Sequence, residues 1–291
     1  MKLIRFGEAG KEKPGLVLPD GRHVDASAFV SDYNEEFFGN GGIARLEAWI
    51  RTNAAVPAID PSVRLGSPIA RPSKIICIGM NYRDHAAETG APVPLEPVLF
   101  FKSTTSLVGP NDAVVIPKGA GKLDWEVELA VIIGARSSYL SKEDAISHIA
   151  GYALHNDYSE RTFQFDRGGQ WVKGKSADTF APFGPFLATR DEIPNPGNLP
   201  MWLKVNGEFH QKSTTANMVF DVPMLVSYTS QFMTLLPGDV ISTGTPAGVG
   251  FGMKPPKYLQ PGDSVELGID GLGESRQRVV AWTPSGESTP D

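Results

Sequence analysis

The sequence predicts a mainly β protein with some α-helix. Of its 291 residues, 31 are glycine and 24 are proline, and this composition favours many turns between short strands over a helical bundle. Runs rich in β-branched and aromatic residues recur at strand length, whereas one stretch, from Asp221 to about Leu235, has the apolar spacing of a long helix. With 41% hydrophobic residues, the chain can build a substantial core.

The first 70 residues are predicted to form a small N-terminal α+β domain rich in strands. Its expected elements are strands at Lys2–Phe6, Gly15–Leu18 and Arg22–Asp25, and a helix at Ala44–Thr52. A proline-containing stretch at 54–72 then has the composition of a surface linker. We therefore place a domain boundary near residue 70, a larger domain at 71–283, and a polar, flexible tail at 284–291.

The larger domain is predicted to contain most of the strands. They are expected at Lys74–Gly79, Val98–Lys102, Asp124–Gly134, Gly151–Leu154, Val240–Ser242 and Ser264–Ile269, with a hairpin at Leu203–His210. Asn206-Gly207 indicates the hairpin, because this pair suits a two-residue turn. On the long helix we expect the core-facing stripe to consist of Met224, Leu225, Tyr228, Phe232 and Leu235.

Composition and charge exclude several classes of function. The net charge of −6 and the pI near 5.5 give no support for binding nucleic acid or an anionic membrane. The single cysteine, Cys77, excludes an internal disulfide and a cysteine metal cluster. The start of the chain has no apolar signal-peptide core, and no apolar run reaches the ~20 residues of a membrane span. We expect a cytoplasmic protein without a nucleic-acid or membrane partner.

The strand at Asp124–Gly134 carries two acidic side chains on one face. Because strand side chains alternate, Glu126 and Glu128 point the same way, while Trp125 and Val127 point the other way. Neighbouring carboxylates on an apolar strand repel each other and resist burial. A bound divalent cation would relieve this repulsion. The alternative is an antiparallel strand with one solvent-exposed face, where paired glutamates are ordinary.

A predicted short helix at Asp84–Thr89, ended by Gly90, brings a histidine and a carboxylate together. His85 and Glu88 are three residues apart and therefore lie on one face of this helix. A carboxylate raises the basicity of an imidazole and fixes its tautomer, as a general base requires. The alternative is an ordinary surface pair of the kind common on exposed helices.

Further polar candidates follow. Asp157 stands where a buried strand gives way to a loop, which is a favoured place for a ligand or catalytic group. Arg161 and Gln164 are three residues apart on a predicted helical turn, and Lys175 is either a solvated charge or a group that stabilises an oxyanion. The glycine-rich stretch at 243–250 lacks the Gly-Lys-Ser/Thr ending of a nucleotide loop, but its donors can bind a carboxylate.

Taken together, these residues predict an open metal site. Glu126, Glu128 and Asp157 supply three oxygen ligands and leave coordination positions for water and substrate. With no sulfur ligand at hand, Mg²⁺ or Mn²⁺ is favoured over zinc, and Ca²⁺ remains an alternative.

The same motifs, in the same order, resemble the fumarylacetoacetate hydrolase family. They are Asn-Tyr-x-x-His-x-x-Glu at 81–88, Glu-x-Glu-Leu-Ala at 126–130, Asp157 followed by Arg161 and Gln164, Lys175-Ser176, and Thr-Gly-Thr-Pro-x-Gly-Val-Gly at 243–250. The resemblance extends from about residue 70 to 283. It implies a mixed β-sandwich roll as the catalytic domain, usually paired in a homodimer.

The resemblance also implies a role for each motif. Glu126, Glu128 and Asp157 would hold the metal, the helix bearing His85 and Glu88 would act as a lid, and Lys175 would face the reacting carbonyl. The substrate-binding residues expected from it are Gln164, Thr245 and, less directly, Arg161, together with Tyr82, Lys102 and Gly244.

The implied reaction is hydrolysis of a carbon–carbon bond in a 2,4-diketo acid. The metal chelates the 2-oxo acid and stabilises an enolate, His85 oriented by Glu88 activates water, and Lys175 stabilises the oxyanion. The sequence of residues 79–90 and 101–106 resembles that of the family's bacterial branch that acts on 2,4-diketo-3-deoxy sugar acids from L-rhamnonate or L-fuconate. Enzymes of that branch release pyruvate and a hydroxy acid. Oxaloacetate decarboxylation, acylpyruvate cleavage and 2-oxo-acid isomerisation remain alternatives, as does a metal-stabilised module that binds without turnover.

Overall fold

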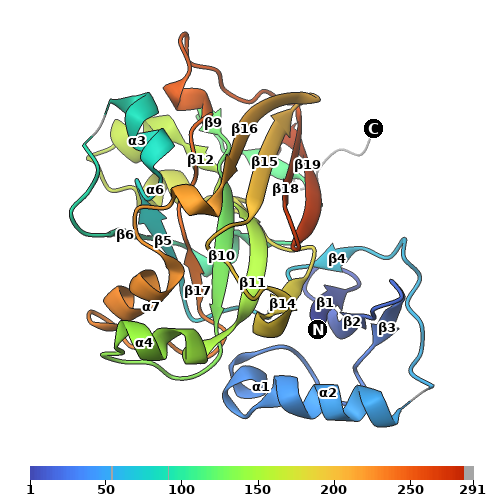
Figure 1. The fold of residues 1–291 in the computed structure, drawn as a ribbon. Coiled ribbons are helices and arrows are strands. Elements are labelled where there is room, and N and C mark those ends of the chain that lie inside the picture. The colour runs from blue at the N-terminus through green and yellow to red at the C-terminus, as the bar shows by residue number, and fades with distance from the viewer. Residues whose placement is uncertain (54, 91, 285–291) are drawn as a thin grey trace.

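The computed structural model describes residues 1–53, 55–90 and 92–284, which form two main β-sheets with helices around them (Figure 1). Apart from Pro284, the predicted tail lies outside the described residues, and so does Ala54 of the predicted linker. The prediction of a mainly β fold is confirmed.

The larger sheet is mixed and has ten strands. In order across the sheet they are β3 (His23–Asp25), β2 (Lys13–Val17), β1 (Lys2–Phe6), β14 (Leu187–Thr189), β11 (Ile149–Asn156), β10 (Val127–Ile133), β17 (Val240–Ser242), β5 (Ile75–Gly79) and β6 (Val98–Lys102), with β4 (Leu65–Gly66) paired to β1. Neighbours are antiparallel except β17 and β5, which are parallel.

The second sheet packs across part of the first. Its strands, in order, are β16 (Glu208–Thr214), β15 (Pro200–Val205), β18 (Ser264–Ile269), β19 (Gly273–Ala281) and β8 (Val114–Ile116). Two small pairs accompany it, namely β9 (Leu123–Asp124) with β12 (Ser159–Glu160), and β7 (Leu107–Val108) with β13 (Ala181–Pro182). Apolar side chains of β10 and β11 meet those of β15 and β18 in one core cluster, so the arrangement is the predicted sandwich.

Helices are short and lie at the margins of the sheets (Figure 1). They are α1 (Glu35–Gly39), α2 (Gly42–Thr52), α3 (Arg83–Thr89), α4 (Lys142–Ala145), α5 (Arg161–Phe165), α6 (Val172–Lys175) and α7 (Val222–Ser230). Single 3₁₀ turns occupy η1 (Thr104–Ser106), η2 (Ile146–His148), η3 (Arg190–Glu192), η4 (Thr215–Asn217) and η5 (Gly250–Gly252). The prediction of a short helix ended by Gly90 is confirmed by α3, whose C-cap Gly90 has a left-handed φ of 67°.

Strand β10 is the centre of the molecule. All seven of its residues are buried, because β11 and β17 flank it and both of its faces are covered. The alternative of a strand with one solvent-exposed face is therefore wrong. The predicted strand is also interrupted, since Trp125 and Glu126 lie between β9 and β10 outside either strand.

The long helix is shorter than predicted, and Leu225 is the member of the predicted stripe that is buried within it. Helix α7 ends at Ser230, and Leu235 instead exchanges two backbone hydrogen bonds with Ser137. Residues Val222, Leu225, Val226, Thr229 and Ser230 face the core, while Phe232 is 62% exposed. Pairing with a distant segment outweighed the local helical spacing of the apolar residues.

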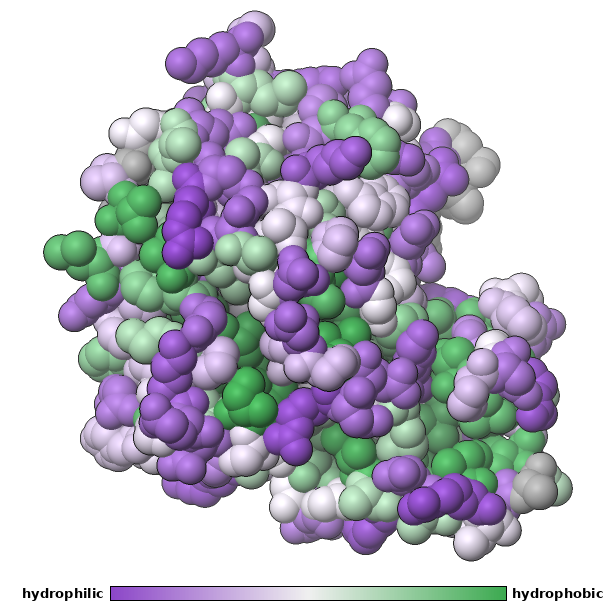
Figure 2. All heavy atoms as spheres, in the orientation of Figure 1, coloured by the Kyte–Doolittle hydropathy of each residue, from purple (hydrophilic) through white to green (hydrophobic). Residues whose placement is uncertain are grey.

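The N-terminal strands continue the large sheet. Strand β1 pairs with β14, and the core on this side joins Leu3 and Leu16 to Ala130 and Ile132 of β10. In Figure 2, apolar residues gather at the lower right over these N-terminal elements and at the left edge over the segment between α3 and β6. The domain boundary near residue 70 stays a prediction.

None of the helices in the described part of the chain is both long and apolar enough to cross a membrane.

Candidate metal centre and active site

Three buried carboxylates meet where β10 and β11 lie side by side. Glu128 lies in β10 opposite His155, and this register brings Asp157 beside Glu126, whose carbonyl accepts the Asp157 N–H at 2.9 Å. One carboxylate oxygen from each of Glu126, Glu128 and Asp157 lies within 4.8 Å of the others. A divalent cation holds oxygen ligands at about 2.0–2.6 Å, so ligands on opposite sides of it are roughly 4–5 Å apart. The three residues therefore fit such an ion.

Three cations surround these carboxylates. Lys175, only 2% exposed, donates to Glu126 at 2.8 Å and to Asp157 at 2.9 Å. Lys102 donates to the other oxygen of Asp157, and Arg161 donates to Glu126 at 2.7 Å. Lys175 is thus not a solvated charge, and it lies where it can reach groups bound at the carboxylate cluster.

The surroundings shift the pKa values of the three carboxyl groups in different directions. Burial opposes ionisation of Glu126 and Asp157. The charges of Lys175 and Arg161 outweigh burial at Glu126, and those of Lys102 and Lys175 outweigh it at Asp157. Both pKa values therefore lie below their usual range. Burial raises the pKa of Glu128 well above its usual range, and repulsion from the other two carboxylates adds to the shift. A cation would favour the ionised form of Glu128.

Glu128 is held by Ser242, which the sequence analysis did not assign, and by Gly244, which it assigned to the substrate. Its carboxylate accepts from the Ser242 hydroxyl at 2.5 Å and from the Gly244 N–H at 3.0 Å. Ser242 in turn lies 2.6 Å from Nδ1 of His155, whose pKa burial lowers to about 3. The histidine is therefore neutral at neutral pH and positions the hydroxyl. The only sequence signal for Ser242 was its place at the end of a strand beside the glycine-rich stretch.

Helix α3 presents the predicted histidine–carboxylate pair to the same region. Nδ1 of His85 lies 3.1 Å from Glu88, and His85 is 9% exposed. The other oxygen of Glu88 accepts the N–H of Gly248 at 2.9 Å, which ties α3 to the glycine-rich stretch. The alternative of an exposed surface pair is therefore wrong.

Gly248 has no room for a side chain, because the backbone of His210 lies against it. Its φ is 103°, and a Cβ added there would lie 1.9 Å from the backbone oxygen of His210. We expect Gly248→Ala to lower the free energy of unfolding by at least about 2 kcal/mol, because backbone strain and the clash add. Chemical denaturation measures the effect. The matched control is Gly262→Ala, where φ is 97° and a Cβ meets nothing within 4 Å, so only strain of about 1 kcal/mol is expected. Equal losses for the two variants would contradict this account.

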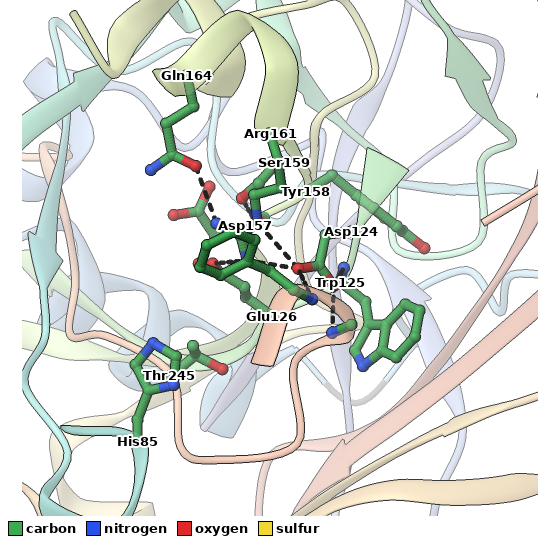
Figure 3. Close-up of polar contacts among 12 residues, drawn as sticks. His85, Asp124, Trp125, Glu126, Asp157, Tyr158, Ser159, Arg161, Gln164 and Thr245 are labelled. Carbon is green, nitrogen blue, oxygen red and sulfur yellow. Dashed lines mark hydrogen bonds and ion pairs between the residues drawn. The ribbon is translucent and has the colours of Figure 1, made fainter. Parts of the chain in front are cut away.

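Arg161 links several of the polar groups (Figure 3). It bonds Asp124 and Glu126, and the Gln164 amide oxygen accepts from it at 2.9 Å. Asp124 also accepts the N–H groups of Gly250 and Phe251. Arg161 thus connects the metal-ligand cluster to the end of the glycine-rich stretch.

These groups open into a cavity of about 220 Å³. Its lining includes the predicted site residues His85, Glu126, Glu128, Arg161, Gln164, Lys175 and Thr245. Of the other predicted substrate contacts, Tyr82 bonds Met201 and Lys102 bonds Asp157, while Gly244 bonds Glu128. None of these three is among the described residues that line the cavity. Their predicted substrate contacts have no support in this arrangement.

Comparison with known proteins is consistent with this geometry. Residues 74–280 match the family model described as fumarylacetoacetate (FAA) hydrolase C-terminal. A Burkholderia multivorans protein named "Putative hydrolase" is 52% identical to this chain, over 97% of this chain and 99% of its own length. The structure of fumarylacetoacetate hydrolase from Exiguobacterium antarcticum has a TM-score of 0.86 and 37% sequence identity to this chain. The alignment covers 97% of this chain and 100% of that chain.

A third similar structure contains ligands. Maleylpyruvate hydrolase from Sphingobium sp. SYK-6, in complex with manganese(II) ion and pyruvate, has a TM-score of 0.81 and 29% identity. The alignment covers 97% of this chain and 100% of that chain.

Proposed function

Because this chain belongs to the fumarylacetoacetate (FAA) hydrolase family, we propose that it is a divalent-metal-dependent hydrolase that cleaves a carbon–carbon bond in a 2,4-diketo acid. One observation carries the proposal. Glu126, Glu128, His85 and the buried Lys175 all line one cavity. Asp157 completes the carboxylate cluster behind it, and Glu88 holds His85. A purely structural metal site would require neither the histidine pair nor the lysine.

Each group has a part in the reaction. A cation held by Glu126, Glu128 and Asp157 would supply Lewis-acid stabilisation to the 2-oxo-acid end of the substrate. His85, with Nδ1 held by Glu88, takes a proton from water at its other nitrogen, and the water oxygen attacks the 4-carbonyl carbon. Lys175 stabilises the oxyanion that forms there. The bond between the third and fourth carbons breaks, and its electron pair passes to the third carbon as the enolate of pyruvate. The proton that His85 took from water then goes to that carbon, which releases a carboxylic acid and pyruvate.

We propose Mg²⁺ or Mn²⁺ as the cation, with Ca²⁺ as the alternative, because all the donors are carboxylate oxygens. The manganese in the maleylpyruvate hydrolase complex supports this choice. Removing the ion with a chelator is expected to abolish turnover, and adding Mn²⁺ is expected to restore it.

Cation affinity is expected to rise with pH. The raised pKa of Glu128 means that the metal-free site keeps a proton that must leave before the carboxylate can bind an ion. Below that pKa the dissociation constant for Mn²⁺ should therefore fall by up to about tenfold per pH unit, and above it should level off. Calorimetric titrations at several pH values measure this, with Glu128→Gln as the control that removes the dependence. A dissociation constant that does not change with pH would contradict the assignment of Glu128.

The test of the proposed reaction is a substrate screen with the Mn²⁺-loaded protein. We expect pyruvate from 2,4-diketo acids, including the 2,4-diketo-3-deoxy sugar acids that the sequence favours. Turnover of oxaloacetate without cleavage of any 2,4-diketo acid would replace the proposal with a decarboxylase. Rearrangement of a 2-oxo acid without cleavage would replace it with an isomerase, and binding without turnover would favour a binding module.

We also propose a cytoplasmic homodimer, on the family resemblance. Light scattering of the purified protein should then give twice the 31.4 kDa mass of the chain. A mass equal to that of one chain would contradict the dimer.

A further inference from the structure

The wall of the active-site cavity contains a continuous series of aromatic rings. Ring centroids lie 5.3 Å apart for Phe100 and Trp171, 6.3 Å for Trp171 and Phe165, and 5.4 Å for Phe165 and Phe251. All four side chains line the cavity, and we refer to them as the aromatic arc. They come from strand β6, from the residue preceding α6, from α5 and from η5, so separate segments of the chain converge to form it.

Both ends of the aromatic arc lie beside the charged groups of the site. The Lys175 ammonium is 5.0 Å from the centre of the Phe100 ring, and the Arg161 guanidinium is 5.8 Å from the centre of the Phe251 ring. Lys175 and Arg161 are almost fully buried, whereas Phe165 and Phe251 are 40% and 43% exposed. The charged groups therefore lie deep, whereas the arc includes rings that reach the surface. A substrate whose 2-oxo-acid end is at the carboxylate cluster can extend its other end toward these rings.

Most other polar groups of the lining already have partners. The exceptions among the described lining residues are the Gln164 amide nitrogen, the Trp171 indole N–H and Nε2 of His85, none of which belongs to a lysine or arginine. Arg161 and Lys175 are paired with carboxylates, and the hydroxyls of Thr89 and Thr245 donate to backbone carbonyls. Ile78 and Met80 add apolar surface. The described lining residues thus include no lysine or arginine without a carboxylate partner that could bind a carboxylate at the far end of the substrate. Hydroxyl groups placed there would exchange water for aromatic carbon, which is unfavourable.

We propose that the acyl end of the 2,4-diketo acid is apolar, namely an aromatic ring or an alkyl chain. This inference rests on the proposed function. Aromatic side chains stack on rings and bury alkyl groups well. The inference departs from the sugar acids that the sequence favoured, because their hydroxylated ends match the arc poorly. Of the motifs that suggested them, His85 lines the cavity and Lys102 contacts the carboxylate cluster, so these two residues lie at the reacting end that all diketo acids share.

The test compares four 2,4-diketo acids that differ only at the acyl end, using the Mn²⁺-loaded enzyme and pyruvate detection. The ends are a methyl group, a phenyl ring, a carboxyethyl group and a dihydroxypropyl group. We expect kcat/KM for the phenyl compound to exceed that for the carboxylated and hydroxylated compounds by at least about tenfold. A carboxylated or hydroxylated compound cleaved as efficiently as the phenyl compound would overturn this inference and leave the proposed function standing. Pyruvate from none of the four would overturn both.

A pair of variants locates the preference. Phe165→Ser changes a partly exposed member of the arc, and we expect it to lower the ratio of kcat/KM for the phenyl compound to that for the methyl compound about tenfold. The matched control is Phe232→Ser, which removes an exposed ring outside the cavity and should leave the ratio unchanged. An unchanged ratio in Phe165→Ser, or equal changes in both variants, would overturn the assignment of the arc.

Discussion

Replacing His85 with alanine is expected to lower kcat by about 10²–10⁴ while the protein stays folded and still binds its cation. The imidazole lies beside Glu88 at the cavity, and it is not one of the three proposed metal ligands. Removing it takes away the group that deprotonates water, and alanine is well tolerated in a helix such as α3. Steady-state kinetics, thermal unfolding and Mn²⁺ titration of the variant measure the three properties.

A second variant separates chemistry from structure at this helix. Glu88→Gln retains an oxygen for the Gly248 N–H but removes the charge that orients the imidazole. We expect a smaller loss of kcat than in His85→Ala, because the imidazole remains but no longer has a charged partner to orient it. Wild-type kinetics in His85→Ala would show that this histidine is not the base.

Replacing Lys175 with methionine is expected to damage both activity and stability. The ammonium is 2% exposed and donates to both Glu126 and Asp157, so its loss leaves buried carboxylates with less compensation. We expect a loss of about 3–5 kcal/mol in the unfolding free energy of the metal-free protein, and a fall of about 10²–10³ in kcat from the missing oxyanion stabilisation.

The control for Lys175 lies on the same helix. Lys173 is exposed, and its ammonium donates to the Arg167 carbonyl rather than to the carboxylate cluster. Lys173→Met should therefore leave kcat and stability close to wild type. If added Mn²⁺ restores the stability of Lys175→Met but not its kcat, the catalytic role is separated from the electrostatic one. Full kcat in the Mn²⁺-loaded variant would contradict the catalytic role.

Local patterns predicted the parts of the site that depend on spacing along one element. Strand alternation predicted that Glu126 and Glu128 face the same way, and helical spacing paired His85 with Glu88. The end of a strand singled out Asp157. The pairing of His85 with Glu88 is confirmed, because it depends only on the geometry of one helix. Glu126 and Glu128 also lie together, although Glu126 stands just before strand β10.

Contacts between distant segments were beyond such patterns. The sequence assigned Lys102 to the substrate, but the fold places its ammonium against Asp157, where it offsets a buried charge. The hydrogen-bonded series from His155 through Ser242 to Glu128 depends on the pairing of β10 with β11 and β17. The early end of α7 has the same origin, since Leu235 pairs with Ser137. In each case a tertiary contact, absent from any single window of sequence, decides the outcome.

The central claim is that water activated by His85 cleaves a carbon–carbon bond, and oxygen-18 labelling tests it most directly. The Mn²⁺-loaded enzyme is mixed with a 2,4-diketo acid in oxygen-18 water, and mass spectrometry is applied to the acid fragment after a single turnover, with recovered substrate setting the exchange background. The account predicts pyruvate together with one labelled oxygen in the carboxylate of the acid fragment. Products formed without label above that background, or release of carbon dioxide in place of the acid fragment, would contradict it.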